Sequence, residues 1–271
     1  MGTRITLGQY LPGNTIIHKL DPRTKIILMI AYIVMLFLVK SLPVFLVPAI
    51  YIVATLLLAK IPIRYMISSL RPVRWLLVIM FLLNLFLTSG KTTIVEFWIV
   101  SISEEALRKA LFITLRLLLL VAGTSLLTLT TSPIELTDGL ERLMSPLSVF
   151  KFPAHEIAMM MTIALRFIPT LMKEVERIQK AQMSRGVDFS SGSLVSRLKN
   201  MIPILVPLFV SSFRRADELA TAMESRCYHG GEGRTRLHQL KMHPNDYLAF
   251  TFMVILTLAA VILSNLIGVR V

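Results

Sequence analysis

The sequence predicts an all-α integral membrane protein with about five transmembrane helices and a cytoplasmic domain of one short and two long helices. Three observations predict this class. Of the 271 residues, 55% are hydrophobic, and the mean hydropathy is +0.70, which is too apolar for a soluble domain. Long charge-free runs recur along the chain, up to the 23 residues of 247–269. Between them, residues 131–244 carry charged, amphipathic helical patterns.

The first predicted transmembrane helix begins at Asp21, a favourable N-cap, with Pro22 at the first helical position. Its charge-free run, residues 26–39, has 14 residues, whereas a full crossing needs about 20. Lys25 and Lys40 flank this run and can snorkel to lengthen it. We therefore expect a short first span after a polar leader.

Further spans are predicted at 41–59, 75–90 and 106–130, which completes an N-terminal region of residues 1–130. The stretch 60–74 has four basic residues and no acidic one, which favours an amphipathic segment at an anionic leaflet. Residues 91–108 are expected to form a loop. Arg116 lies well inside a span. Because it can snorkel toward Arg108 and Lys109, about two turns away, we interpret it as structural.

The cytoplasmic domain is predicted over residues 131–244. Ser132 is a helix cap, and Glu135, three residues later, completes a capping box that opens a short helix ending before Ser145. Two long helices follow, at 154–186 and 194–227, and the last transmembrane helix lies within 245–271.

The two long helices resemble each other. A shift of 41 positions aligns six pairs, three of them identical. The pairs are Lys173 with Arg214, Glu176 with Asp217, Ile178 with Leu219, Ala181 with Ala222, Ser184 with Ser225 and Arg185 with Arg226. Each helix is apolar in its first half and charged in its second. One terminal Arg would be explained by the helix dipole. Its repetition after a small residue favours a partner site, in which Arg pairs with a carboxylate.

Basic residues predict the topology. Lys and Arg number four in the leader, four in 60–74 and 15 in 131–244, against four in the two opposite loops. The positive-inside rule then puts the N-terminus and the helical domain in the cytoplasm and the C-terminus outside. The net charge of +13 does not indicate nucleic-acid binding, because the basic residues flank apolar spans.

Catalytic and cofactor motifs are not recognisable in this sequence. The glycines at 186 and 192 lack the spacing and the lysine of a P-loop, and no nucleophile–base pair stands out. The spacing of Cys227, His229, His238 and His243 matches no metal-site pattern, so we expect neither a metal nor a cofactor. We therefore expect a non-enzymatic protein.

The chain resembles the transmembrane T component of energy-coupling factor (ECF) importers, in the CbiQ-like cobalt transport family. The leader, His18-Lys19-Leu20-Asp21-Pro22-Arg23-Thr24-Lys25, is similar to that family's N-terminal signature. The ends of the long helices, Ser184-Arg185-Gly186 and Ser225-Arg226-Cys227, are similar to its two Ala-Arg-Gly signatures. Both copies keep the Arg, whereas Ser replaces Ala twice and Cys227 replaces Gly.

The resemblance implies a coupling subunit in the cell membrane, for vitamin or metal-ion uptake, with two ABC-type ATPase subunits and a small membrane S component as partners. It implies that the ATPases contact Ser184, Arg185, Gly186, Ser225, Arg226 and Cys227, with Ala181, Ala222, Glu176 and Asp217 in support. It implies S-component contacts in the apolar halves, for which we expect Met159, Met160, Met161, Leu165, Ile204, Leu205 and Leu208. A self-contained permease with its own substrate path is the alternative, and a membrane scaffold or receptor is a third hypothesis.

Overall fold

A computed structural model describes residues 10–88, 93–97, 100–150, 152–189, 193–230 and 240–267. The chain forms two compact units. The first unit comprises Met1–Leu143 and Gln239–Val271, and the second comprises Met144–His238. Helices account for most of both units, so the all-α class is confirmed.

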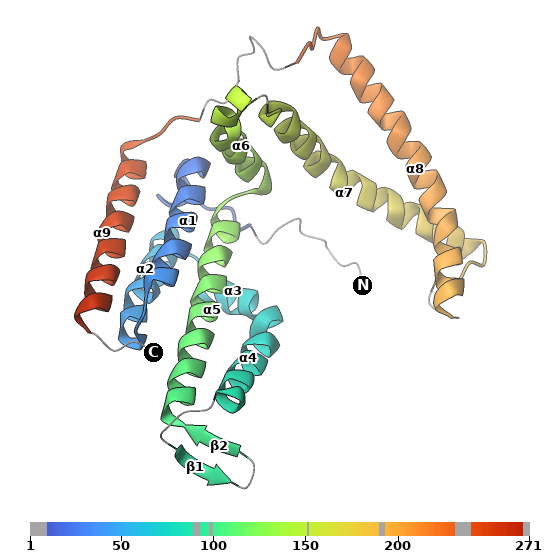
Figure 1. Cartoon of the computed structure of the whole chain (residues 1–271). Coiled ribbons are helices and arrows are strands. Elements are labelled where there is room, and N and C mark those ends of the chain that lie inside the picture. Colours follow the sequence, from blue (N-terminus) through green and yellow to red (C-terminus); the bar gives the residue numbers. More distant parts are fainter. Residues whose placement is uncertain are drawn as a thin grey trace. The chain divides into compact units, whose positions relative to one another are not determined.

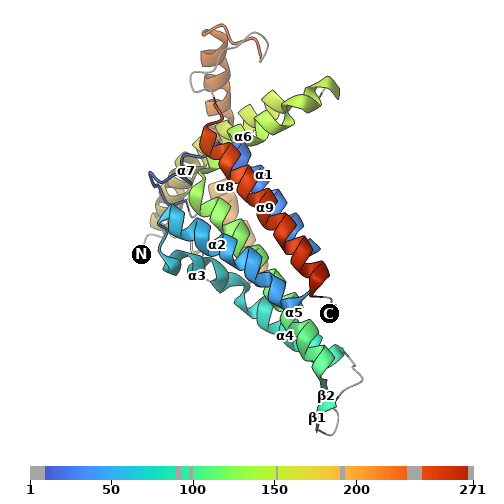
Figure 2. The same cartoon turned by 90° about the vertical axis from the view of Figure 1, so that its left-hand side faces the viewer.

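The helices of the first unit are α1 (Pro22–Leu38), α2 (Leu46–Ala59), α3 (Ile63–Leu70), α4 (Arg74–Leu87), α5 (Glu104–Thr130), α6 (Pro133–Met144) and α9 (Pro244–Leu266). The second unit contains α7 (Ala154–Ser184) and α8 (Leu194–Glu224). Short 3-10 turns lie at Leu42–Phe45, Arg71–Val73 and Ser145–Phe150. Most helices begin and end within a few residues of their expected positions. In Figures 1 and 2, α1 lies alongside α5 and α9.

Four helical stretches among the described residues are long and apolar enough to cross a membrane. These are Leu42–Ala59, Ile63–Leu87, Glu104–Thr130 and Pro244–Leu266. The sequence predicts about five spans, but α1 has only 17 residues and does not reach that length. The stretch Ile63–Leu87 consists of α3, a 3-10 turn at Pro72 and α4. The sequence predicts two separate elements here, an amphipathic segment at 60–74 and a span at 75–90.

One strand pair interrupts the helices. The strands β1 (Thr93–Phe97) and β2 (Val100–Ser103) are antiparallel, with Glu96 opposite Ser101. The prediction of a plain loop over 91–108 is therefore wrong for this part. Ser103 then caps α5, because its Oγ accepts a hydrogen bond from the Ala106 N–H at 3.1 Å. The loop consequently enters the α5 helix directly at Glu104.

The core of the first unit forms around Tyr32 of α1. The Tyr32 ring stacks on Tyr51 of α2, with 5.3 Å between the ring centroids, and its hydroxyl donates to the Leu119 carbonyl of α5 at 3.0 Å. A Cβ at Gly123 would overlap the Tyr32 ring, so only glycine lets α5 approach α1 this closely. The Tyr32 hydroxyl, the one polar group of this side chain, is therefore hydrogen-bonded inside an apolar environment.

Arg116 does not reach outward to water as the sequence suggests. Its Nη2 donates to the Val39 carbonyl at the end of α1 at 2.8 Å. Its guanidinium also lies over the Phe112 ring, 4.5 Å from the centroid. A helix-end carbonyl without a hydrogen-bond partner is costly in an apolar environment. We therefore keep the interpretation of Arg116 as structural, but its partner is the Val39 carbonyl and not water.

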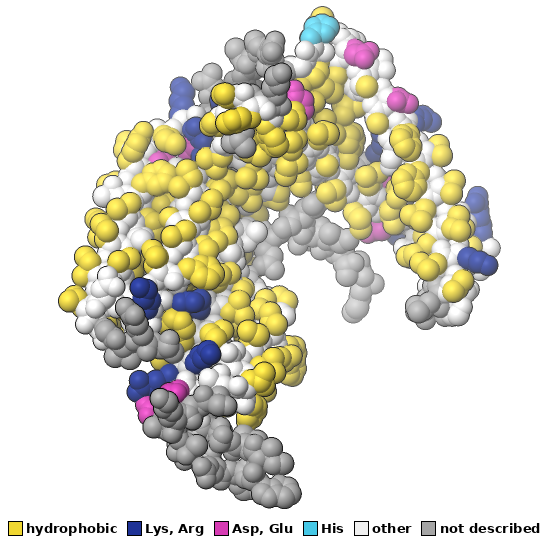
Figure 3. Space-filling view, viewed as in Figure 1, with side chains coloured by type: hydrophobic (Ala, Val, Ile, Leu, Met, Phe, Trp, Pro, Cys, Tyr) yellow, Lys and Arg dark blue, Asp and Glu magenta, His cyan; other side chains and the backbone are white. Residues whose placement is uncertain are grey.

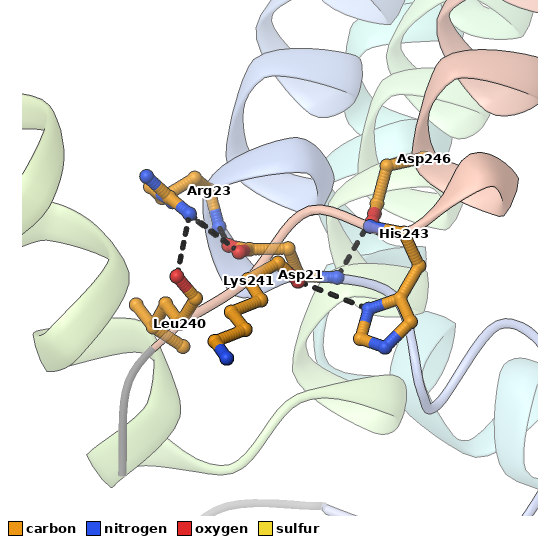
Figure 4. A network of polar contacts seen from close by, with 6 residues as sticks. All are labelled: Asp21, Arg23, Leu240, Lys241, His243 and Asp246. Carbon is orange, nitrogen blue, oxygen red and sulfur yellow. Dashed lines mark hydrogen bonds and ion pairs between the residues drawn. The ribbon is translucent and has the colours of Figure 1, made fainter.

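A polar network joins the starts of α1 and α9 (Figure 4). Asp21 caps α1 and accepts hydrogen bonds from Arg23 on both carboxylate oxygens, at 3.1 Å from Nε and 2.8 Å from Nη2. Asp246, fully buried, accepts from the Asp21 N–H at 3.0 Å and from the His243 N–H at 2.7 Å. Arg23 also donates to the Leu240 carbonyl at 3.3 Å. Burial alone would raise the pKa of Asp21, but the hydrogen bonds and charge of Arg23 outweigh it, and the pKa lies below its usual value.

Helix α6 packs on the first turn of α1. The sequence groups α6 with the two long helices in 131–244, whereas the structure places it in the first unit through Leu143. A Cβ at Gly139 would lie only 3.0 Å from the Pro22 Cβ and 3.1 Å from Ile26 Cδ1, so α6 touches the first turn of α1. The expected capping box at Ser132 is confirmed, because Ser132 and Glu135 exchange hydrogen bonds of 3.0 and 3.2 Å.

Candidate functional site

The two long helices run in opposite directions as a pair (Figure 1). In the second half of α7, the Glu174 carboxylate binds Arg215 of α8, with 3.1 Å between Oε2 and Nη2. These residues stand 41 positions apart, the displacement that aligns the two helices in the sequence. Toward the end of α7, the Gln182 side chain donates to the Pro203 carbonyl at 3.5 Å. The later residue of α7 thus contacts the earlier residue of α8, so the two helices pair antiparallel.

Helix α7 ends in a Schellman turn at its Ser-Arg-Gly sequence. The Val187 N–H donates to the Gln182 carbonyl at 3.1 Å, and the Gly186 N–H donates to Met183 at 3.0 Å. Gly186 has φ +86°, in the left-handed region that this turn requires. The turn therefore fixes Arg185 as the last residue before the chain reverses.

Helix α8 ends in the same turn, displaced by 41 residues. The Tyr228 N–H donates to the Met223 carbonyl at 3.0 Å, and the Cys227 N–H donates to Glu224 at 2.9 Å. Cys227 takes the place of Gly186 and has φ +58°. The sequence repeat is therefore also a repeat of backbone hydrogen bonding, and Arg226 occupies the position of Arg185.

All ten residues assigned to ATPase coupling and its support are exposed. They are Ser184, Arg185, Gly186, Ser225, Arg226, Cys227, Ala181, Ala222, Glu176 and Asp217. Within the part of the chain that the structure describes, neither Arg185 nor Arg226 forms an ion pair. Other arginines of the pair are engaged, since Arg177 binds Glu174 and Arg214 binds Glu218. The two terminal guanidinium groups are therefore free to bind a carboxylate of another molecule.

The two turns lie at opposite ends of the pair. Arg185 lies at the end where the Asn200 side chain donates to the Asp188 carbonyl at 2.6 Å. Arg226 lies at the other end, where the Tyr228 hydroxyl donates to Met159 Sδ at 3.0 Å. Each helix has 31 residues, which corresponds to about 46 Å at 1.5 Å per residue. The pair thus presents two equivalent basic tips separated by roughly the length of a helix.

Comparison with known proteins identifies the family. Residues 13–237 match the family described as Cobalt transport protein, CbiQ. The chain is 54% identical to the energy-coupling factor transporter transmembrane protein EcfT of Thermosediminibacter oceani over 91% of this chain and 92% of that protein. It is 51% identical to EcfT of Acidaminococcus fermentans, over 95% of each chain. EcfT of Lactococcus lactis is 44% identical, over 96% of this chain and 97% of that protein.

The chain belongs to the EcfT family. It is therefore a transmembrane component of an energy-coupling factor transporter in the cell membrane. The match to the family covers both Ser-Arg turns, and also the leader with Asp21 and Arg23.

The EcfT residues expected to contact an S component are only partly accessible. Met160, Met161 and Leu205 are exposed, whereas Met159, Leu165 and Leu208 are half-buried. Ile204 is 9% exposed and buried, so the structure does not place it on an accessible surface.

Helix α8 presents a wider apolar surface than the sequence list contains. We call this the α8 apolar stripe, and it comprises Val195, Leu198, Ile202, Leu205, Val206, Phe209 and Phe213. Its members are 46–69% exposed, and in Figure 3 hydrophobic side chains recur along α8 between polar and charged ones. Their spacing of three and four residues marks one helix face and would have found them from the sequence. Such an exposed stripe is typical of a surface that binds lipid or protein.

The cysteine and histidine residues that the sequence singles out belong to different units. Cys227 and His229 are exposed at the end of α8, and His243 belongs to the first unit. His238 lies outside the described residues. Among the described residues, no three His, Cys, Asp or Glu side chains lie close enough to bind a metal ion.

The first unit contains one cavity that merits comparison with a transport path. Its volume is about 350 Å³, and its walls come from α1, α2, α5 and α9. Apolar side chains dominate the lining, and Lys25 is its one basic member. The Lys25 ammonium donates to the His18 carbonyl at 2.9 Å and the Thr130 carbonyl at 3.0 Å. Two of its three protons are thus committed to backbone, which suits a structural role better than recognition of a polar substrate.

Cys227→Gly is expected to stabilise the turn that ends α8. A side chain at φ +58° is strained, and glycine removes a cost of about 1 kcal/mol. Cys227→Ser keeps the side-chain size and the strain, so it serves as the matched control. Thermal unfolding of the purified protein should show a higher midpoint for Cys227→Gly and an unchanged one for Cys227→Ser. A lower midpoint for Cys227→Gly would show that the thiol itself stabilises the turn.

Proposed function

We propose that this EcfT-family chain couples two ABC-type ATPase subunits to a substrate-binding S component, and that it performs no catalysis itself. The observation that supports this most is the pair of equivalent turns that present Arg185 and Arg226. Two turns with the same hydrogen bonds at a displacement of 41 residues indicate two equivalent binding events. A single catalytic site would need one such feature and not two.

The ATPase contacts follow from the chemistry of the tips. An exposed guanidinium forms bidentate pairs with a carboxylate, and the small Ala181 and Ala222 one turn earlier allow a partner surface to approach. The separation of about 46 Å, one helix length, leaves room for a separate subunit at each tip. Both tips belong to one rigid pair, held at Glu174 and Arg215, so a movement at either tip is transmitted along the other helix.

The S-component contact is assigned to the α8 apolar stripe, together with Met160 and Met161 of α7. So many exposed apolar side chains on a helix pair that is otherwise charged favour a partner with an apolar surface. A small membrane subunit that captures a vitamin or a metal ion is such a partner. Methionine side chains are flexible and polarizable, which suits a surface that accepts more than one S component.

The proposed topology places the N-terminus and the second unit in the cytoplasm, as the distribution of basic residues indicates. It requires five crossings, in which the 17-residue helix α1 spans the membrane together with the four longer stretches. A reporter fused after Val271 should therefore read as extracytoplasmic. A reporter inserted in the glycine-rich turn at 230–233, of which residues 231–233 lie outside the described part, should read as cytoplasmic. Paired alkaline phosphatase and fluorescent-protein fusions measure both. The same side for both reporters would contradict the proposed number of crossings.

Purification from native membranes tests the proposal against a self-contained permease. We expect the tagged chain to retain two ATPase subunits and a small hydrophobic membrane subunit. In liposomes, the chain alone should move no substrate, whereas the complete complex should do so with ATP. Transport by the isolated chain would instead assign the path to its own helices, with the cavity beside Lys25 as the first place to examine.

A further inference from the structure

The first turn of α1 contacts the two segments of the first unit that lead to and from the second unit. The chain leaves the first unit at the end of α6, after Leu143, and returns to it at Gln239. On the outgoing side, Gly139 of α6 lies against Pro22, close enough that a Cβ would approach the Pro22 Cβ to 3.0 Å and its carbonyl carbon to 3.2 Å. On the returning side, Arg23 binds the Leu240 carbonyl at 3.3 Å.

The same turn is anchored to the membrane helices. The Asp21 N–H donates to the buried Asp246 carboxylate, which also caps the first turn of α9. Asp21 accepts hydrogen bonds from Arg23 on both carboxylate oxygens. The Asp21 side chain is fully buried, and the Arg23 side chain is 21% exposed. Figure 4 shows Arg23 between Asp21 and Leu240. A buried, bidentate Arg–carboxylate pair has a fixed geometry, so the Leu240 carbonyl is held at a defined place relative to α1 and α9.

We infer that Asp21-Pro22-Arg23 is a positioning centre that holds both connections of the second unit to the membrane helices, so that movement of α7 and α8 reaches α1 and α9. The inference rests on the proposed coupling function. Without this centre, the two connections remain as covalent links, but they can shift without displacing the membrane helices. ATPase binding, which is assigned to Arg185 and Arg226, does not depend on it.

The test separates transmission from assembly. Arg23→Gln keeps a hydrogen-bond donor for Asp21 but removes the charge and the fork that reaches Leu240. Gly139→Val acts independently on the other connection by placing a branched side chain against Pro22. Arg108→Gln, which replaces an arginine paired with Glu104 inside α5, is the matched control. Each variant is reconstituted as the complete complex, and ATPase content, ATP hydrolysis and substrate uptake are measured on the same preparation.

Both Arg23→Gln and Gly139→Val are expected to retain the ATPases and near-normal ATP hydrolysis, while substrate moved per ATP falls about fivefold or more. Arg108→Gln should match the wild type in all three readouts. Unchanged transport per ATP in both variants would overturn the inference. Loss of the ATPases from both would also overturn it, because the turn would then serve assembly. Failure of the proposed function shows differently, as a wild-type complex that contains no ATPases.

Discussion

Replacing Arg185 and Arg226 together by alanine is expected to release both ATPase subunits from the complex. Each guanidinium is exposed and has no ion pair among the described residues, so a partner carboxylate is its natural counter-ion. Removing one member of such a buried pair costs about 2–5 kcal/mol, which is about 30-fold to several thousand-fold in affinity per site. The two tips belong to one helix pair, so a single intact tip keeps the second ATPase at high effective concentration where the two ATPases also contact each other. Arg185→Ala or Arg226→Ala alone should therefore leave partial assembly and reduced transport.

Arg177→Ala and Arg214→Ala provide matched controls on the same two helices. Their side chains are 77% and 80% exposed, and each is engaged within its own helix. Co-purification of the ATPases should be retained in the double control variant and lost in the double tip variant. Glutamate at either tip should be worse than alanine, through repulsion from the partner carboxylate. If the arginines only complemented helix dipoles, each would contribute under about 1 kcal/mol, and the double tip variant would assemble and transport normally.

Leu205→Asp is expected to release the S component while both ATPases stay bound. Leu205 is 46% exposed within the α8 apolar stripe, and a carboxylate there would be buried without a partner in the complex. Burying an unpaired charge is far more costly than burying a neutral amide, so affinity should fall by orders of magnitude. Met161→Asp tests the corresponding surface of α7, where Met161 is 40% exposed.

Leu205→Asn is the matched control, because it has the shape of the aspartate variant without its charge. It should weaken the S component less than Leu205→Asp does. The readout is the ratio of S component to ATPase in the purified complex. Loss of the ATPases before the S component would show that the apolar and charged halves of the helices have exchanged roles. Equal effects of both variants would assign the loss to side-chain shape.

Local signals in the sequence predict most elements of this fold. Asp21 and Pro22 mark the start of α1, and the capping box at Ser132 marks the start of α6. The ends of α7 and α8 fall within a few residues of the predicted ones, since each terminates in a turn whose residues are adjacent in the chain. These features depend on short-range hydrogen bonds, which a sequence displays directly.

Features that depend on distant residues were not predictable in this way. Ile204 belongs to the predicted apolar half of α8, and periodicity groups residues on a helix face without showing which face becomes buried; Ile204 is buried. The Asp246 carboxylate accepts a hydrogen bond from the Asp21 N–H, 225 residues away in the sequence, and no local pattern predicts this contact. Arg116 likewise satisfies a carbonyl of α1 instead of extending along its own helix. Cys227 adopts a left-handed conformation because the turn requires it, although its side chain disfavours it.

Photocrosslinking from the two tips tests the central claim most directly. Cys227 is the chain's one cysteine and is exposed beside Arg226, so a short thiol-reactive photocrosslinker attached to it reports what that tip contacts. Ser184→Cys in a Cys227→Ser background places the same reagent beside Arg185. In native membranes, we predict that each position captures an ATPase subunit. Capture of the S component alone, or of no ATPase from either position, would contradict the account.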